Sequence, residues 1–212
     1  MNEHEHAFSP ATLAVKGGTR HRPGDGVSPA IQLSSTFVHG GDPSDPDHGI
    51  YTYGRGGSPG YGELERVIAQ LEHGSDAVVF NAGIAAALAV LAEGAPGTAV
   101  VLPYDAYYGI RVRASELLPP NGIEVRFVDQ TNLDDLREAL DGASLLWTET
   151  PTNPLLAIAD LDAIGSICAD MQVPWFCDNT FATPIAQNPL DFGAAGAMHS
   201  VTKYIGGHSD VI

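Results

Sequence analysis

The chain has 212 residues, of which 44% are hydrophobic and 17% charged, a composition that is typical of a soluble globular protein and excludes a disordered or fibrous one. Its 26 acidic and 10 basic residues give a formal net charge of -16, which argues against binding to nucleic acid or to anionic membranes. The sequence has no apolar run of the ~20 residues that a membrane-spanning helix needs, no signal peptide and no metal-like cysteine spacing, so we expect a reduced, cytoplasmic protein without a metal site.

The first part of the chain differs in pattern from the rest. Residues 1–60 are rich in Gly, Pro, Ser and Asp and show little hydrophobic periodicity, which predicts an extended arm with turns such as GGDPSDPDHG at 40–49. An amphipathic helix follows, with apolar residues at helical spacing: Leu64, Val67, Ile68 and Leu71. We therefore expect an arm over 1–60 and an α/β domain over 61–212.

Short apolar runs then alternate with helical patterns. The runs expected to be buried strands are 77–80, 99–103, 123–129, 144–149, 174–178 and 197–200. The helical patterns between them cover 83–92, 108–118, 133–140 and 160–171. Such alternation predicts a parallel sheet with crossover helices, and ligands of these sheets bind beyond the carboxyl ends of the strands.

Small residues follow the first expected strand, where Gly83 opens an Ala-rich helix. Free N–H groups at a helix start can bind an anion such as phosphate, although a start of small residues can also serve packing alone. The segment lacks the GxGxxG spacing of a dinucleotide site and the GxxxxGK[ST] spacing of a P-loop, so neither nucleotide site is supported.

Polar residues also follow the later strands. Asp178 ends an apolar strand, and a buried carboxylate there needs a cationic or hydrogen-bonding partner. Ser200 and Thr202 precede Lys203, and the only other lysine is Lys16. Hydroxyls and a lysine in one turn can hold a phosphate and present an amine to a carbonyl, which are two requirements for binding pyridoxal 5'-phosphate (PLP). The alternative for Lys203 is a solvated surface lysine.

Two further features are weaker on their own. Tyr104, Tyr107 and Tyr108 follow the strand at 99–103, where one ring could cover a flat cofactor or all three could simply pack. Arg55 lies among glycines, where its guanidinium could clamp a phosphate or remain solvated.

Taken in order, these segments resemble the PLP-dependent enzymes of cysteine and methionine metabolism, the family of cystathionine γ-synthase, cystathionine γ-lyase, methionine γ-lyase and their O-acylhomoserine relatives. The segments that carry the resemblance are SPAIQLSSTF (28–37), YGRGGSPG (53–60), DAYYG (105–109), ETPTNP (149–154), DNTFATP (178–184) and HSVTKYIGGHSD (199–210). The resemblance implies the large domain of fold type I, similar to aspartate aminotransferase, preceded by an extended N-terminal arm.

The resemblance also implies roles for single residues. Lys203 corresponds to the lysine that forms a Schiff base with PLP and then transfers protons, and Asp178 to the partner of the pyridine nitrogen. Its negative charge would keep that nitrogen protonated. Further cofactor contacts are implied for Gly83, Ile84, Thr180, Ser200 and Thr202.

Other implied roles concern the edges of the site. Tyr108 is the best match for the tyrosine that stacks on the cofactor ring, with Tyr107 as the alternative. Asn153 and Arg113 match positions near the substrate or cofactor. In the family, a Tyr-x-Arg pair from a neighbouring subunit completes the phosphate site; here it would be Tyr53 and Arg55, which predicts a homodimer or homotetramer with shared sites.

The activity implied is γ-elimination or γ-replacement on a sulfur amino acid, with cystathionine as the expected substrate. Methionine γ-lyase or O-acetylhomoserine sulfhydrylase activity is an alternative, because Ile110 and Arg111 stand where the family usually has Gly-Thr. A second alternative is a catalytically incomplete fragment, because family members continue beyond the lysine turn into a further domain. Lys16 has no counterpart in the site and is expected to be structural or solvated.

Overall fold

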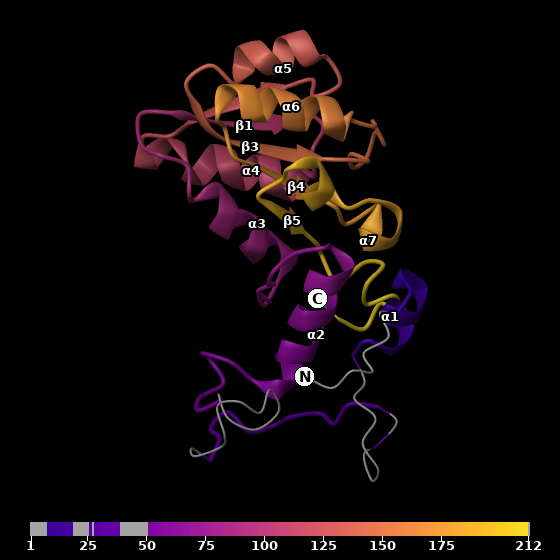
Figure 1. The fold of residues 1–212 in the computed structure, drawn as a ribbon. Helices are drawn as coiled ribbons and strands as arrows, with labels where there is room; N and C mark the ends of the chain where they lie inside the picture. The colour runs from indigo at the N-terminus through magenta and orange to yellow at the C-terminus, as the bar shows by residue number, and fades with distance from the viewer. Residues whose placement is uncertain (1–7, 19–25, 27, 39–50, 212) are drawn as a thin grey trace. The chain divides into compact units, whose positions relative to one another are not determined.

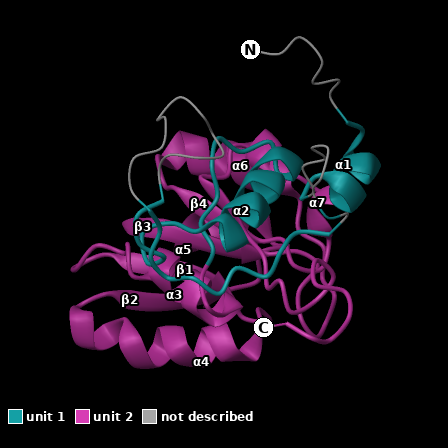
Figure 2. Ribbon diagram, turned by 90° about the horizontal axis from the view of Figure 1, so that it is seen from below, with its two compact units in different colours: residues 1–79 teal, residues 80–212 magenta. Residues whose placement is uncertain are grey.

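A computed structural model describes residues 8–18, 26, 28–38 and 51–211 (Figure 1). The chain divides into two compact units, residues 1–79 and 80–212 (Figure 2). The residues predicted to form the arm, 1–60, all belong to the first unit. The turn expected at 40–49 lies outside the described residues. No helix in the described ranges is long and apolar enough to cross a membrane.

Two helices among the described residues of the first unit begin in the same way. In α1 (Pro10–Lys16) and α2 (Pro59–Leu71), a serine caps the helix, its side-chain oxygen accepts a backbone N–H, and proline takes the first helical position. The capping residues are Ser9 and Ser58. Helix α2 confirms the amphipathic pattern, and α1 adds a short helix that the sequence pattern did not predict, because its Ser-Pro start outweighs the lack of periodicity.

A correction concerns residues 77–80, whose apolar composition predicts a strand. No ladder among the described residues includes them, and Val78 is 73% exposed. Carboxylates take the place of a neighbouring strand as hydrogen-bond acceptors: Ala77 N donates to Asp76 Oδ1 at 2.8 Å, and Val79 N to Glu65 Oε1 at 2.9 Å. An apolar run forms a strand only where another strand accepts its backbone hydrogen bonds.

The second unit contains a five-stranded sheet in the order β2-β1-β3-β4-β5, and every pairing is parallel. The strands are β1 (Ala99–Pro103), β2 (Glu124–Val128), β3 (Ala143–Glu149), β4 (Trp175–Asp178) and β5 (Gly196–Met198). Each matches a predicted run to within two residues at either end. The parallel α/β architecture predicted from the sequence is therefore confirmed.

Helices precede and connect the strands. They are α3 (Gly83–Leu91), α4 (Tyr108–Leu117), α5 (Leu133–Ala139), α6 (Leu161–Met171) and the short α7 (Thr183–Ala186), with 3-10 turns at Pro119–Asn121 and Pro189–Phe192. Figure 1 shows α5 and α6 on one face of the sheet and α3 and α4 on the other. The four longer helices agree with the predicted patterns; α7 and the 3-10 turns were not predicted.

Alternation along the strands supplies the core on both faces. Leu146 of β3 packs with the residues of α5 and α6, whereas its neighbours Leu145 and Trp147 pack with those of α3 and α4. All three side chains are at most 2% exposed. The central strands β1 and β3 are thus buried on both faces, which explains why their sequences are largely continuous apolar runs and not alternating ones.

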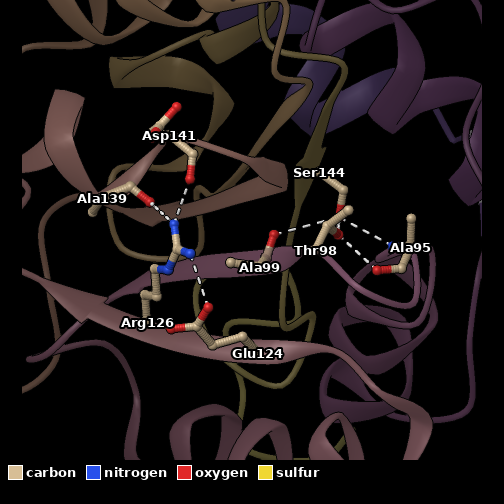
Figure 3. Close-up of polar contacts among 8 residues, drawn as sticks. All are labelled: Ala95, Thr98, Ala99, Glu124, Arg126, Ala139, Asp141 and Ser144. Atoms are coloured by element: carbon tan, nitrogen blue, oxygen red, sulfur yellow. Dashed lines mark hydrogen bonds and ion pairs between the residues drawn. The ribbon is translucent and has the colours of Figure 1, made fainter.

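Polar contacts lie at the amino ends of β1 and β3 and beside β2 (Figure 3). Beside β1 and β3, Thr98 Oγ1 donates to Ser144 Oγ at 2.7 Å, and Ser144 Oγ accepts from Ala95 N at 3.1 Å. On β2, Arg126 donates to the carbonyls of Ala139 and Asp141 at 3.0 and 2.6 Å. None of these contacts involves the carboxyl ends of the strands, where parallel sheets bind their ligands.

Candidate functional site

A cavity of about 220 Å³ lies at the carboxyl ends of the strands in the second unit. Glu149, Asp178 and Met198, the last residues of β3, β4 and β5, line it together with the start of α3. The predicted site residues that the structure brings together here are Gly83, Ile84, Asn153, Asp178, Thr180, Ser200, Thr202 and Lys203. The position agrees with the rule that parallel sheets bind ligands beyond the carboxyl ends of their strands.

Asp178 is buried, with 7% of its surface exposed, and is fixed by Thr180. The Thr180 hydroxyl donates to Asp178 Oδ1 at 2.5 Å, and the Thr180 N–H donates to the same oxygen at 3.1 Å. Burial raises the pKa of Asp178, while the Thr180 hydrogen bonds and the positive charges of His199 and Lys203 act in the opposite direction. A cationic group inside the cavity would therefore lie beside a buried carboxyl group whose position is fixed, and its charge would favour the ionised form of Asp178.

The same threonine anchors the lysine turn. Thr180 Oγ1 accepts from the N–H of Ser200 at 2.9 Å, and the Lys203 N–H donates to the Ser200 carbonyl at 3.0 Å. The Lys203 side chain is exposed and lines the cavity. Thr180 thus links the carboxylate of Asp178 to the turn that presents the lysine.

The start of α3 approaches this turn closely. A Cβ atom on Gly83 would lie 3.0 Å from Ser200 Cβ and 3.1 Å from Ser200 Oγ, which is tighter than ordinary contacts. Ala82, the N-cap residue of α3, has no side-chain group that could accept the first N–H groups of the helix. The N–H groups of Gly83 and Ile84 and the hydroxyls of Ser200 and Thr202 therefore form one set of donors suited to an anion.

Glu149 belongs to the site, although the sequence analysis assigned it no role. It is 3% exposed; Oε2 accepts from the N–H of Tyr107 and Oε1 from the N–H of Asn153, both at 2.7 Å. Burial and the charges of Asp178 and Asp105 raise the pKa of Glu149 to about 8, although the two N–H donors lower it. The signal that singled out Asp178, a carboxylate at the end of an apolar strand, could also have identified Glu149.

The residues after β1 divide between the cavity and the surface. Tyr107 lines the cavity, whereas Tyr108 is 69% exposed and is not part of the lining formed by the described residues. Arg113 is also outside that lining, and its exposed guanidinium pairs with Glu116 at 2.7 Å. Ile110, at 1% exposure, closes the cavity wall.

The Tyr-x-Arg pair lies in the first unit. The Arg55 guanidinium carbon stands 5.3 Å from the centroid of the Tyr53 ring, which is a cation–π distance. Tyr53 is 49% exposed, and its backbone forms an isolated antiparallel bridge with Thr36. Both side chains are thus available on the surface of their own unit.

Comparison with known proteins identifies the family. Residues 11–212 match the model of the Cys/Met metabolism PLP-dependent enzymes. The chain is 40% identical over 212 residues to cystathionine gamma-synthase of Mycobacterium bovis, covering 99% of this chain and 54% of that protein. It is 37% identical over 203 residues to cystathionine beta-lyase of Lactococcus lactis subsp. cremoris, covering 95% and 53% of the two chains.

A solved structure agrees with these sequence matches. Cystathionine gamma synthase from Xanthomonas oryzae pv. oryzae, in complex with aminoacrylate and cysteine, superposes with a TM-score of 0.87 at 36% identity, covering 97% of this chain and 53% of that one. The fold is thus that of the fold type I PLP-dependent enzymes, as the sequence predicted. The chain spans about half the length of the curated relatives it matches. By sequence and by fold, it belongs to the Cys/Met metabolism PLP-dependent enzymes, a family whose cofactor is pyridoxal 5'-phosphate.

Proposed function

We propose that the cavity binds PLP and that the protein catalyses γ-elimination or γ-replacement on a sulfur amino acid, with cystathionine as the substrate. The observation that carries the proposal is that Lys203 and Asp178 line one cavity with a set of anion donors. The names of the relatives, cystathionine gamma-synthase and cystathionine gamma-lyase, support the choice of substrate.

The residues that line the cavity are suited to bind PLP. The close approach of Gly83 to Ser200, at which a Cβ atom would lie only 3.0 Å from Ser200 Cβ, brings the N–H groups at the start of α3 beside the hydroxyls of the lysine turn, where a phosphate would be held. The buried Asp178 carboxylate would hold a proton at the pyridine nitrogen. The exposed Lys203 amine is free of the core and can reach into the cavity.

When bound, PLP would supply an electron sink for the electron pair released at the substrate α-carbon. The Lys203 amine would take the substrate α-proton as a general base and then assist transfer of a β-proton, so that the γ-substituent can leave with the electron pair of its bond to the γ-carbon. Asp178 would maintain the charge on the ring nitrogen, because a buried carboxylate in low dielectric interacts strongly with a nearby cation. The remaining lining residues would orient the substrate and exclude water.

Tyr107 is proposed as the residue that covers the cofactor ring, in place of Tyr108. The proposal is supported by the position of Tyr107 in the cavity lining and by the 69% exposure of Tyr108. Asn153 is retained as a residue near the cofactor or substrate because it lines the same cavity. A role for Arg113 near the cofactor or substrate has less support, since its exposed side chain pairs with Glu116.

Titration with PLP tests cofactor binding directly. The wild-type chain should develop a protein-bound PLP absorbance band and keep PLP covalently attached after borohydride reduction, on the peptide that contains Lys203. Lys203→Ala should lose both signals, and the matched variant Lys16→Ala should keep both. Covalent retention of PLP by Lys203→Ala would refute the assignment of Lys203.

A panel of substrates tests the reaction class. Cystathionine, methionine and O-acetylhomoserine should be assayed for 2-oxobutanoate, pyruvate and free thiol, because γ-elimination and β-elimination leave different oxo acids. Formation of 2-oxobutanoate from cystathionine is expected. Pyruvate as the main product would instead favour the β-lyase reaction named for the Lactococcus lactis relative. Cofactor binding is measured separately, so that a chain that binds PLP without turnover is recognised as catalytically incomplete.

The oligomer and the location are also proposed. We infer a cytoplasmic homodimer or homotetramer in which Tyr53 and Arg55 of one subunit complete the phosphate site of another. The proposal is supported by the exposure of both side chains and by the need of a phosphate for a guanidinium partner. Sedimentation with and without PLP measures the oligomeric state, and a monomer that binds PLP fully would contradict site sharing.

A further inference from the structure

We propose that Glu149 is a positioning residue that holds the loop carrying Tyr107 and the loop carrying Asn153 against the cofactor cavity. The inference rests on the proposed function for the identity of the cofactor, but the contacts that carry it belong to the protein alone. The Glu149 carboxylate bridges two loops that follow different strands, β1 and β3, and each of these loops contributes a residue to the cavity lining.

The bridge uses both oxygens of one carboxylate. Tyr107 and Asn153 lie 42 residues before and 4 residues after Glu149, and both donate backbone N–H groups at 2.7 Å, a short distance for such bonds. Tyr107 is the N-cap residue of α4, so fixing its N–H also fixes where that helix begins. A side chain with a single acceptor could hold one loop but not both.

The backbone of Glu149 is fixed as well. Gln130, which is 1% exposed, donates from Nε2 to the Glu149 carbonyl at 2.5 Å, and the Glu149 N–H donates to Gln130 Oε1 at 3.4 Å. A second contact joins the same two loops, because the Thr152 hydroxyl donates to Asp105 Oδ2 at 2.7 Å. Two buried contacts therefore tie one loop to the other, and Glu149 provides the one that reaches the cavity.

The charges around Glu149 suit a carboxylate that works through hydrogen bonds. Asp178 lies opposite it on β4, in register, and Asp105 faces it from the β1–α4 loop, so both carboxylates disfavour a further negative charge. The two backbone N–H groups favour the ionised form, and Lys203 lines the same cavity. Loss of the Glu149 charge is thus compatible with folding, which makes Glu149→Gln a usable variant: it keeps the shape but only one acceptor.

Amide NMR tests the bridge without the cofactor. In wild-type protein the N–H signals of Tyr107 and Asn153 should shift together as pH is raised through about 8, because both groups donate to the carboxyl group that loses its proton. In Glu149→Gln neither signal should follow that titration. Ser144→Ala is the matched control: it removes a hydrogen-bonding side chain from the opposite end of the same strand and should leave the shared titration intact.

The PLP complex tests whether the bridge positions the site. Glu149→Gln should bind PLP up to about tenfold more weakly, as expected for the loss of one buried hydrogen bond, and the circular dichroism of bound PLP should change. Ser144→Ala should match the wild type in both. Independent titration of the two amides, or wild-type affinity and dichroism in Glu149→Gln, would overturn the inference. Failure of the wild-type chain to bind PLP would instead contradict the proposed function, and the amide titration would still decide whether Glu149 joins the loops.

Discussion

Two buried carboxylates, Glu149 and Asp178, end neighbouring strands in direct register. Burial raises the pKa of both, but their partners differ. Asp178 has hydrogen bonds from Thr180 and nearby positive charge, whereas Glu149 has two backbone N–H donors and faces other carboxylates. The first is thus suited to hold a cation in the cavity, and the second to hold the protein backbone.

Glu149 should make the stability of the protein depend on pH. Its folded-state pKa of about 8 is above its ordinary value of 4.5, so its contribution to the free energy of unfolding is fully present below about pH 4.5 and is lost as pH rises through about 8. Glu149→Gln has no carboxyl group to titrate at this position, so the variant should not lose stability in this way. The stability of the variant relative to wild type should therefore rise between pH 5 and pH 9 by at least ~1.4 kcal/mol, the equivalent of one pKa unit. Urea unfolding at pH 5, 7 and 9 measures the difference, and parallel pH profiles would contradict the expectation.

Gly83→Ala should damage the site although alanine favours helices. The new Cβ would lie 3.0 Å from Ser200 Cβ, so α3 or the lysine turn would have to shift by a few tenths of an ångström, and we expect a cost of about 1–3 kcal/mol in the free energy of unfolding. Affinity for PLP or inorganic phosphate should fall together with stability. Gly60→Ala, near the start of α2, is the control, because its nearest contact would be an ordinary 3.5 Å. Equal behaviour of the two variants in thermal unfolding and phosphate binding would rule out the proposed close approach.

The end of α5 depends on a residue of the neighbouring strand β2. Arg126 donates to the carbonyls of Ala139 and Asp141 and pairs with Glu124 at 2.8 Å (Figure 3). A cation at the carboxyl end of a helix satisfies carbonyls that lack intrahelical partners and interacts favourably with the helix dipole. The same charged pair lies on an edge strand, where charges discourage pairing with another chain.

Arg126→Ala should lower the free energy of unfolding by about 1 kcal/mol, because two carbonyl acceptors lose their donor. Arg113→Ala provides the comparison: it removes an exposed pair with Glu116, and such pairs contribute about 0.5 kcal/mol or less. Denaturant unfolding of both variants checks the order. A loss for Arg113→Ala that equals or exceeds that for Arg126→Ala would contradict this assignment.

Site sharing between subunits can be tested by complementation. Arg55→Ala and Lys203→Ala chains should each lose PLP binding, whereas co-refolded mixtures should regain up to about one quarter of it, because half of the dimers are mixed and one site in each is intact. Absorbance of retained PLP measures the recovery. Mixing Lys203→Ala with a chain that carries both substitutions is the control and should give no recovery. Equal values for the two mixtures would show that Arg55 does not serve a neighbouring site.

Several parts of the fold were predictable because their signals are local. Apolar runs that alternate with helical patterns indicated β1 to β5 and the longer helices, since buried parallel strands need apolar residues on both faces. The Ser-Pro start of α1 is also a local signal, although the segment around it lacks hydrophobic periodicity. Residues 77–80 have the composition of a strand but form none. A local pattern cannot show whether a neighbouring strand is present to accept the backbone hydrogen bonds.

The chemistry of the site was already present in the sequence: a lysine after two hydroxyls, an aspartate at a strand end and a glycine at a helix start. Their order along the chain was enough to indicate the family. Only the tertiary structure decided that Tyr107 and not Tyr108 lines the cavity, and that Glu149 joins two loops. The physical reason is that composition and periodicity record burial and backbone conformation, whereas a contact between residues 42 positions apart depends on the register of neighbouring strands and the direction in which each loop leaves them.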